Sequence, residues 1–550
     1  MYDNFMKSAK NNLIKKVNFT GVLIALIITP WVNIDSMIIP KMILLFFLAL
    51  YCLPYIFTNK EIIQNKFYKW ILFLLILNIL QILAVLINSD APLEQQIFGR
   101  VGRGLGIITQ ISLLVVLFTV IININFSDLK SINLSFIIAS VASSFYCVLQ
   151  SQGLDPFAWV TRTNGIIGTL GNPNFQSSFA AMGVAPVILI YWHKRKKYFL
   201  SAILLLLLFY AIYLCRSIQG YLIATVSIIL ILIISTWYQK KLYSISLIIS
   251  TLFVGILSIC GMLNMGPLAT YLYKVSVTSR GEFWRSAINT ANSNPIFGTG
   301  IDSFGDVFLR YRDENAANGI GEFTDNAHNY FLEYAATGGY PLMLINITII
   351  LVTLVSIFKV QKNLGRFDNL FIAIFISWTA FQMQSIISPG NITSMFWNMV
   401  FSGVLIGLSN RIDSGEIENE KKQSNKSPLN ILIGFLLIAG ALIIYPLYNS
   451  DKELLTAYEQ QDAVALLKVA QAYPESTVTY QKAGKVMLES GLFIQALDIG
   501  RAAVEFNPNA VSAWALILGN PKAPMPEREK AALEINRLDP FNKVIKNFKY

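Results

Sequence analysis

One polar stretch of the chain, residues 263–339, carries most of the side chains that could do chemistry. Of the two histidines only His328 lies in it, close to the start of a predicted helix that runs to Ala336. The positive end of a helix dipole disfavours an imidazolium and keeps the ring neutral, so that it can accept a proton near pH 7. His328 is therefore a candidate base; the alternative is a histidine that only hydrogen-bonds the loop backbone. Asn329 is predicted to orient this loop.

A predicted amphipathic helix over residues 276–292 carries a candidate phosphate contact, Arg280. A guanidinium suits phosphate because its planar fork can donate two parallel hydrogen bonds. Trp284 lies four residues later on the same face, where it can pack or provide a platform for a sugar ring. The apolar side of this helix is expected to contain Phe283, Trp284, Ala287 and Ile288.

Further arginines could supply positive charge to the same ligand. They are Arg100, Arg103, Arg216 and Arg285. The alternative for each is contact with lipid headgroups or a local ion pair, for example with Asp302 or Asp313. For the set as a whole we favour an anionic ligand.

Two glycine-rich turns frame these residues. Residues 168–174, Gly-Thr-Leu-Gly-Asn-Pro-Asn, precede an apolar block, and Asn172 or Asn174 can cap the helix that follows. Alone, this stretch is only a loop–helix junction. Residues 295–300, Pro-Ile-Phe-Gly-Thr-Gly, break the chain before a second short helix predicted near 302–311.

The elements that must position these residues are membrane helices. Of the 550 residues 54% are hydrophobic and only 14% are charged, whereas a soluble protein carries about 25% charged residues. Apolar blocks of roughly 18–22 residues recur, and this length crosses a hydrocarbon core of about 30 Å. We predict an all-α, polytopic membrane bundle of about thirteen transmembrane helices. The predicted spans are 17–34, 38–57, 67–88, 104–124, 131–150, 173–192, 198–215, 217–237, 243–262, 340–358, 369–388, 392–409 and 429–447.

Lysines accumulate in one alternating set of connectors, beginning with the segment before the first span. Because cytoplasmic loops are enriched in lysine and arginine, this set and the N-terminus are predicted to be cytoplasmic. The polar stretch and the C-terminal end then lie outside. This topology accounts for most of the net charge of +11, so no nucleic-acid partner is expected. The predicted parts are an N-terminal bundle (1–262), an extracytoplasmic loop that is the expected active site (263–339), further transmembrane helices (340–447) and an extracytoplasmic tail (448–550).

The tail is charged and alanine-rich, with helical periodicity. Tyr473-Pro474, Asn507-Pro508 and Asp539-Pro540 recur at spacings of 34 and 32 residues. Proline ends the second helix of each predicted pair, and small residues let neighbouring helices pack closely. The tail therefore resembles the tetratricopeptide repeat, with about three units including degenerate ends. Such repeats bind partners or brace a neighbouring domain.

The ordered combination of motifs resembles the O-antigen ligase and polymerase family of bacterial membrane glycosyltransferases. The family pattern is an Arg-x-x-x-Trp helix, a Pro-x-x-Gly-x-Gly turn and a His-Asn pair before the next span, all within one outer loop. Here these are found at Arg280, residues 295–300 and His328. Residues 168–174 and the segment 98–104, Phe-Gly-Arg-Val-Gly-Arg-Gly, match members with repeat tails.

The resemblance spans about residues 95–410 and contains one departure. Many members carry a Ser-Arg pair at the outer start of a mid-chain span, where this chain has Arg216-Ser217. Arg216 is therefore shifted relative to the family's arginine.

The resemblance implies a GT-C-like enzyme that transfers a glycan from a polyprenyl-diphosphate donor to an acceptor hydroxyl. The reaction would take place on the outer face of the bacterial cytoplasmic (inner) membrane, in the assembly of lipopolysaccharide or another cell-surface polysaccharide. His328 and Arg280 would be catalytic. The diphosphate or glycan would be bound by Arg100, Arg103, Arg216, Arg285, Asn329 and Trp284.

No cofactor is expected, and no metal, because the outer side offers one histidine and no cysteine. The expected partners are the polyprenyl-linked glycan, an acceptor lipid, glycan or protein, membrane lipids, and a protein that binds the repeat tail.

Other functions compete with an O-antigen ligase. A polysaccharide polymerase and a protein O-oligosaccharyltransferase of the same family differ from it in their acceptor. A lipid or solute transporter would place ionisable groups or broken helices near the membrane midplane, whereas the predicted spans are nearly free of charge. A non-catalytic assembly protein would need neither Arg280 nor His328.

Overall fold

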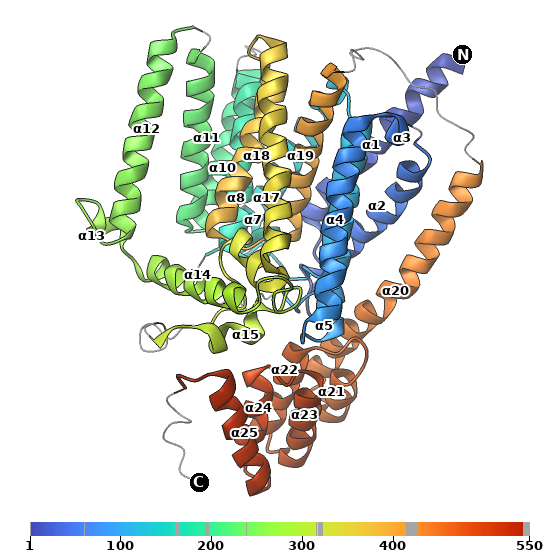
Figure 1. Ribbon diagram of the computed structural model, residues 1–550, viewed down its shortest axis with the longest axis vertical. Coiled ribbons are helices and arrows are strands. Elements are labelled where there is room, and N and C mark those ends of the chain that lie inside the picture. The colour runs from blue at the N-terminus through green and yellow to red at the C-terminus, as the bar shows by residue number, and fades with distance from the viewer. Residues whose placement is uncertain are drawn as a thin grey trace.

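The computed structural model describes residues 2–59, 61–157, 159, 165–192, 197–237, 239–314, 316, 323–413 and 427–542. Every regular element within these residues is a helix, which confirms the predicted all-α fold. The helices of the bundle (Figure 1) are α1 (Tyr2–Leu26), α2 (Ile39–Phe57), α4 (Lys66–Asn88), α6 (Ile107–Asn123), α7 (Leu129–Ser151), α8 (Pro173–Met182), α9 (Val184–Val187), η3 (Ile188–Trp192), α10 (Tyr198–Leu214), α11 (Ile218–Trp237), α12 (Lys241–Met262), α17 (Tyr330–Leu364), α18 (Asn369–Ile387), α19 (Ile392–Asp413) and α20 (Ser427–Glu459). The connecting helices are α3 (Glu61–Gln64), α5 (Leu93–Phe98), η1 (Phe126–Asp128), η2 (Gly168–Leu170), α13 (Ala269–Leu272), α14 (Val275–Ser293) and α15 (Phe304–Tyr311). The tail contains α21 (Ala463–Ala470), α22 (Thr477–Glu489), α23 (Phe493–Phe506), α24 (Val511–Leu518) and α25 (Met525–Leu538).

Among the described residues, ten helices are long and apolar enough to cross a membrane, and the shorter α6 and α10 are also apolar. Each predicted span coincides at least in part with a helix. The predicted end of the first span was wrong. Helix α1 ends at Leu26, so residues 27–34 are a loop with turns rather than the end of the first span. The helix predicted to run to Ala336 and the span predicted from residue 340 both lie in α17, where a kink at Gly339, whose φ is 76°, separates two helices.

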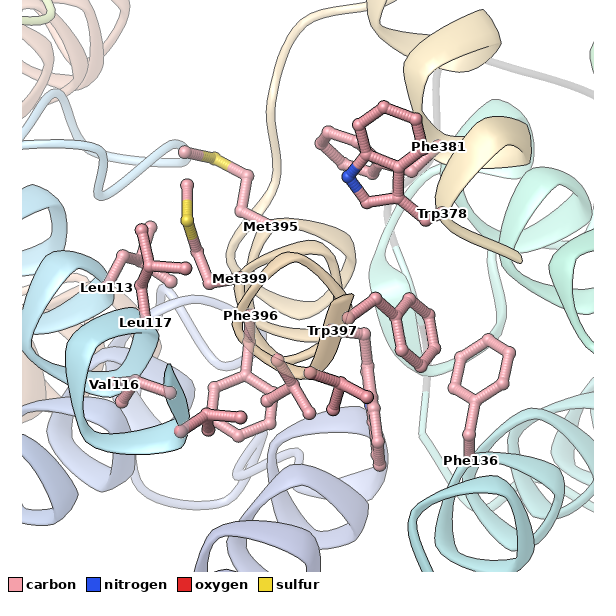
Figure 2. Close-up of a cluster of buried hydrophobic side chains, with 14 of the residues drawn as sticks. Leu113, Val116, Leu117, Phe136, Trp378, Phe381, Met395, Phe396, Trp397 and Met399 are labelled. Atoms are coloured by element: carbon pink, nitrogen blue, oxygen red, sulfur yellow. The ribbon is translucent and has the colours of Figure 1, made fainter. Parts of the chain in front are cut away.

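Helix α19 forms the centre of the bundle. Its apolar window is 100% buried, whereas only 6% of the corresponding window of α12 is buried, which places α12 at the periphery. Figure 2 shows side chains of α19 between those of α6, α7 and α18. The ring of Phe136 on α7 lies 5.1 Å from that of Trp397 and 5.0 Å from that of Phe401. This close packing fixes α19 and therefore also the segment 388–391 that leads into it.

The polar stretch and the tail occupy the same end of the bundle (Figure 1). Helices α5, α14 and α15 lie there beside the tail, whereas α3, the N-terminus and the start of α20 lie at the opposite end. Two of the basic connectors, residues 193–196 and 414–426, lie outside the described residues. The side of the membrane that each end faces stays a prediction.

Helices α14 and α15 agree with the two helices predicted in the polar stretch. They pack through a small apolar cluster that includes Phe283, Ala287, Phe304 and Phe308. One expected member of this face was wrong, because the Ile288 side chain is 42% exposed. It is not part of the cluster, so the buried face is narrower than predicted.

The Pro-x-x-Gly-x-Gly turn fixes α14 against the first turns of α17. Thr299 and Gly300 donate their N–H groups to the carbonyls of Ala336 and Thr337, both at 3.0 Å. Gly298 has a φ of 63°, and a Cβ at this position would overlap the backbone of Thr337. Glycine is required here because no other residue combines this conformation with so close an approach.

The five tail helices pack around apolar clusters of their own. Pro474, Pro508 and Pro540 follow the ends of α21, α23 and α25, which is the order expected of helix pairs. The assignment to the tetratricopeptide repeat stays a prediction.

Polar contacts between described residues join the tail to the polar stretch. Nη2 of Arg312 lies 2.7 Å from Oδ1 of Asp539 in a buried ion pair. Nδ2 of Asn507 donates to Oδ2 of Asp306 at 3.2 Å. The tail is thereby docked on the same helices that carry the candidate site.

Candidate active site

A cavity of about 320 Å³ lies where the loops at this end of the bundle meet. Its wall is built from residues of the segments 34–38, 102–103, 167–175, 325–328 and 388–391, together with Trp159. Three predicted site features therefore meet in one place: His328, Arg103 and the glycine-rich stretch 168–174. Aspartate, asparagine and serine side chains alternate with apolar ones in the wall, which is typical of a site for a polar organic ligand.

His328 enters the cavity wall from the loop before α17. Its φ of 50° is left-handed, and Oδ1 of Asn326 holds the turn by accepting the His328 N–H at 2.9 Å. The imidazole stacks on the Phe283 ring with centroids 5.4 Å apart. The indole N–H of Trp284 donates to the His328 carbonyl at 3.5 Å, so Trp284 supports the histidine loop and is not part of the cavity wall. A non-glycine residue in this conformation is typical of functional sites.

The pKa of His328 is lowered from 6.5 to about 4. Burial is the main cause, Arg280 and Arg103 act in the same direction, and Asp325 opposes them in part. The ring is therefore neutral at pH 7, as expected. The cause is burial and the two arginines, whereas the sequence suggested the helix dipole. It is a weaker base than a free imidazole, while it can still accept a hydrogen bond from a hydroxyl group.

Three predicted site segments converge on the last turn of α18. Nε of Arg280 donates to the carbonyl of Ile387 at 3.1 Å, and Nε2 of Gln219 at the start of α11 donates to the same carbonyl at 3.4 Å. Nδ2 of Asn329 donates to the carbonyl of Ile386 at 3.0 Å, and its Oδ1 caps α17. Helix α18 then leads directly into the cavity wall. Arg280 is thereby held close to the histidine loop.

Arg280 has no carboxylate partner in the part of the chain that the structure describes. Its remaining contact is from Nη1 to the carbonyl of Ser276 at 3.0 Å. Burial lowers the pKa of Arg280, but a guanidinium stays protonated near neutral pH. A half-buried cation that is bonded only to carbonyl oxygens can accommodate an anionic ligand.

Arg100 and Arg103 are instead held in a buried ion-pair network. Arg100 pairs with Asp306, whereas Arg103 pairs with Asp302 at 2.8 Å and with Glu333 at 3.1 Å. Oδ2 of Asp302 also accepts the Arg100 N–H at 2.8 Å. Local ion pairing therefore describes these two arginines better than a free phosphate contact. Only Arg103 lines the cavity.

The other two arginines lie outside the cavity wall. Arg285 is half exposed on α14 and pairs with Asp313 at 2.6 Å. Arg216 is exposed just before α11 and has a left-handed φ of 52°. The neighbouring hydroxyl of Ser217 donates to Oδ1 of Asn174 at 2.7 Å, which ties the Arg216 segment to the cavity wall.

The glycine-rich stretch has a well-defined conformation. Asn172 caps α8 by accepting the Asn174 N–H at 2.8 Å. Gly168 has a φ of 57°, and a Cβ there would overlap a side chain of α8. The carbonyl of Thr169 accepts a hydrogen bond from the buried ammonium of Lys41, a residue that no motif marks in the sequence.

Sequence reasoning missed two acidic residues of the cavity wall, Asp35 and Asp325. Burial alone would raise the pKa of Asp325. The positive charges of Arg103 and Arg100 lower it by more than burial raises it, so the pKa lies below its usual range. Its place three residues before His328 was the available signal, whereas Asp35 lies in the turn after α1 and belongs to no motif. Within the described residues, no three His, Cys, Asp or Glu side chains cluster as metal ligands.

One family model matches part of the chain. Residues 203–347 match the family model for O-antigen ligase. The match runs from α10 into α17 and includes Arg216, Arg280 and His328, but not Arg100 or Arg103. It supports a membrane-embedded protein of the O-antigen ligase family with a glycosyl-transferring function. Comparison with curated proteins gave no match.

Proposed function

We propose that the protein transfers a glycan from a polyprenyl-diphosphate carrier to an acceptor hydroxyl on the outer face of the bacterial cytoplasmic membrane. The observation that carries this proposal is the combination of His328 in a polar cavity with a nearby Arg280 that has no carboxylate partner among the described residues. Both residues lie in the segment that matches O-antigen ligase.

The donor half of the reaction requires positive charge. The leaving lipid diphosphate is already stable as an anion, so it needs electrostatic stabilisation more than a proton donor. Arg280 would supply this charge, and Arg216 is the second predicted arginine without a carboxylate partner in the described chain. Their segments meet because Arg280 and Gln219 share the Ile387 carbonyl.

The acceptor half would use the cavity. The neutral imidazole of His328 can accept a hydrogen bond from the acceptor hydroxyl and orient its oxygen. Asn172 and Asn174 in another segment of the wall offer amide groups to further hydroxyls of a glycan. A ligase, a polymerase and a protein O-oligosaccharyltransferase would share this chemistry and differ in the molecule that carries the hydroxyl.

The proposal includes a direction across the membrane. The N-terminus would be cytoplasmic, and the polar stretch and the tail would be extracytoplasmic. Their position at one end of the bundle supports this topology, as does the predicted lysine distribution at the other end. The tail would act as a tetratricopeptide-like brace for the loop, supported by the Arg312–Asp539 ion pair.

Single substitutions in a strain that lacks the chromosomal copy test the proposal. His328→Ala and Arg280→Ala should each reduce glycan transfer by roughly 10²-fold or more, with unchanged amounts of protein in the membrane. Arg310→Ala removes an exposed arginine of α15 and is the matched control. Full transfer by both the His328 and the Arg280 variants would contradict the proposal. The glycosylated product that disappears in the null strain identifies the acceptor.

A further inference from the structure

The turn between α1 and α2 brings a carboxylate, that of Asp35, into the same cavity wall as His328. Oδ2 of Asp35 accepts the backbone N–H of Gly102 at 2.8 Å. The Asp35 N–H in turn donates to the two carboxylate oxygens of Asp451 on α20, at 3.1 and 3.3 Å. Both the backbone and the side chain of Asp35 are therefore held in place at the cavity.

This carboxylate has capacity left for a ligand. In the described part of the chain no arginine or lysine forms an ion pair with Asp35. Three acidic residues near the cavity are in ion pairs with arginine: Asp302, Asp306 and Glu333. The Asp325 carboxylate accepts a hydrogen bond from Nδ2 of Asn326 at 2.6 Å. A carboxylate has about four acceptor positions, and the backbone groups of Gly102 and Ile38 occupy only part of them.

Three groups in the wall can accept a proton, and their surroundings differ. The pKa of His328 is about 4, and that of Asp325 is below its usual range because nearby arginines outweigh burial. Burial and the negative charge of Asp451 raise the pKa of Asp35 to about 6. Asp35 is therefore ionised near neutral pH and is the strongest base of the three, which suits a general base.

We propose that Asp35 is the catalytic base that removes the proton of the acceptor hydroxyl, while His328 orients that hydroxyl. This inference rests on the proposed glycosyl transfer. The hydroxyl oxygen forms a bond to the anomeric carbon of the donor, and the bond from that carbon to the diphosphate oxygen breaks. The electron pair of the broken bond leaves with the lipid diphosphate beside Arg280. The hydroxyl proton passes to the Asp35 carboxylate and then to solvent.

Charged groups surround Asp35 on both sides. From the tail, Asp451 on α20 raises its pKa and Lys482 on α22 lowers it. The other charged or titratable groups of the cavity wall are Arg103, Asp325 and His328. Among these wall groups Asp35 has the pKa of about 6, and an acidic limb is assigned to it when that limb also disappears in Asp35→Asn.

Asp35→Asn is the direct test. The amide oxygen can still accept the Gly102 N–H, but the side chain can no longer take a proton. Membranes from the deletion strain carrying each variant contain the native donor and acceptor, so initial rates of glycan transfer can be measured in them. We expect the rate to fall by roughly 10²–10⁴-fold, with unchanged membrane levels. The wild-type rate should fall as the pH is lowered through about 6, and this acidic limb should be lost in Asp35→Asn.

Asp451→Asn provides a readout that a purely structural role would not move. Its amide oxygen can still accept the Asp35 N–H, but the charge that raises the pKa of Asp35 is gone. The acidic limb of the rate profile should therefore move to lower pH. An unmoved limb would overturn the assignment of that limb to Asp35.

The remaining outcomes separate the two proposals. A wild-type rate in Asp35→Asn overturns the base assignment and leaves glycosyl transfer standing. A single acidic limb near pH 4 that disappears in His328→Ala also overturns it, because the base would then be His328. Absence of glycan transfer by the wild-type protein instead overturns the proposed function itself.

Discussion

Removing either partner of the Arg312–Asp539 ion pair should release the tail from the polar stretch. Only 10% and 4% of the two side chains are exposed, so water screens the pair weakly. Replacing one partner of a buried pair with alanine costs about 3–5 kcal/mol because the other charge stays buried without a partner. Nε of Arg312 has no hydrogen-bond partner among the described atoms, so the contact is not bidentate. We therefore expect the lower value, about 3 kcal/mol, or roughly a 10²-fold shift in the docking equilibrium.

Hydrogen exchange of the purified full-length protein measures this shift. Amides of α25 and α15 should lose protection in Asp539→Ala and Arg312→Ala, while those of α19 in the centre of the bundle should not change. The double variant Arg312→Met with Asp539→Leu should regain much of the protection, because neither charge is then left buried alone.

The exposed pair Arg501–Glu527 within the tail is the matched control. Its side chains are 47% and 35% exposed, and Arg501→Ala should cost less than about 1 kcal/mol. Protection of α25 at the wild-type level in both single variants of the buried pair would refute the reasoning. So would a loss in Arg501→Ala as large as the loss in Asp539→Ala.

Two more predictions follow from the site geometry. Gly298→Ala should destabilise the loop by about 1–3 kcal/mol, because the new Cβ would combine a left-handed φ of 63° with overlap on the backbone of Thr337. The Tm in detergent should fall by more than in the control Gly153→Ala, which has a similar φ but lies in an open turn. His328 should make stability fall as the pH drops from 6.5 towards about 4, since the unfolded histidine gains a proton that the folded ring resists. The Tm of His328→Gln should fall less than that of the wild type in this window, and equal slopes would contradict the assignment. The raised pKa of Asp35 makes stability rise as the pH drops, in the wild type and in His328→Gln alike. The difference between the Tm–pH slopes of the two proteins therefore reports on His328 alone.

The sequence predicted the helices well because the length of an apolar run is a local property. It did not predict which helix is central, because that depends on packing. Helix α19 is less apolar than the peripheral α12 and yet fully buried, since a helix surrounded by other helices tolerates polar and small side chains that lipid does not. Mean hydropathy alone would therefore rank the burial of these two helices in the wrong order.

The same distinction applies to the site. His328, Arg280 and the glycine-rich turns were found because they belong to motifs of fixed spacing. Asp302 was named as a possible ion-pair partner of the arginines, but Glu333, the other partner of Arg103, was not, because it lies 230 residues away in the sequence and only the fold brings it near. Asp35 was missed for a similar reason. Its turn has no motif, and its role depends on a cavity that five distant segments close.

The contacts of the tail argue against a module that only recruits partners. Asn507 of the tail donates to Asp306, which pairs with Arg100 in the ion-pair network behind one wall of the cavity. On another wall, Asp451 of α20 holds the backbone of Asp35. We therefore propose that the docking of the tail is linked to the shape of the cavity, through Asn507 directly and through α20, the helix that leads into the tail.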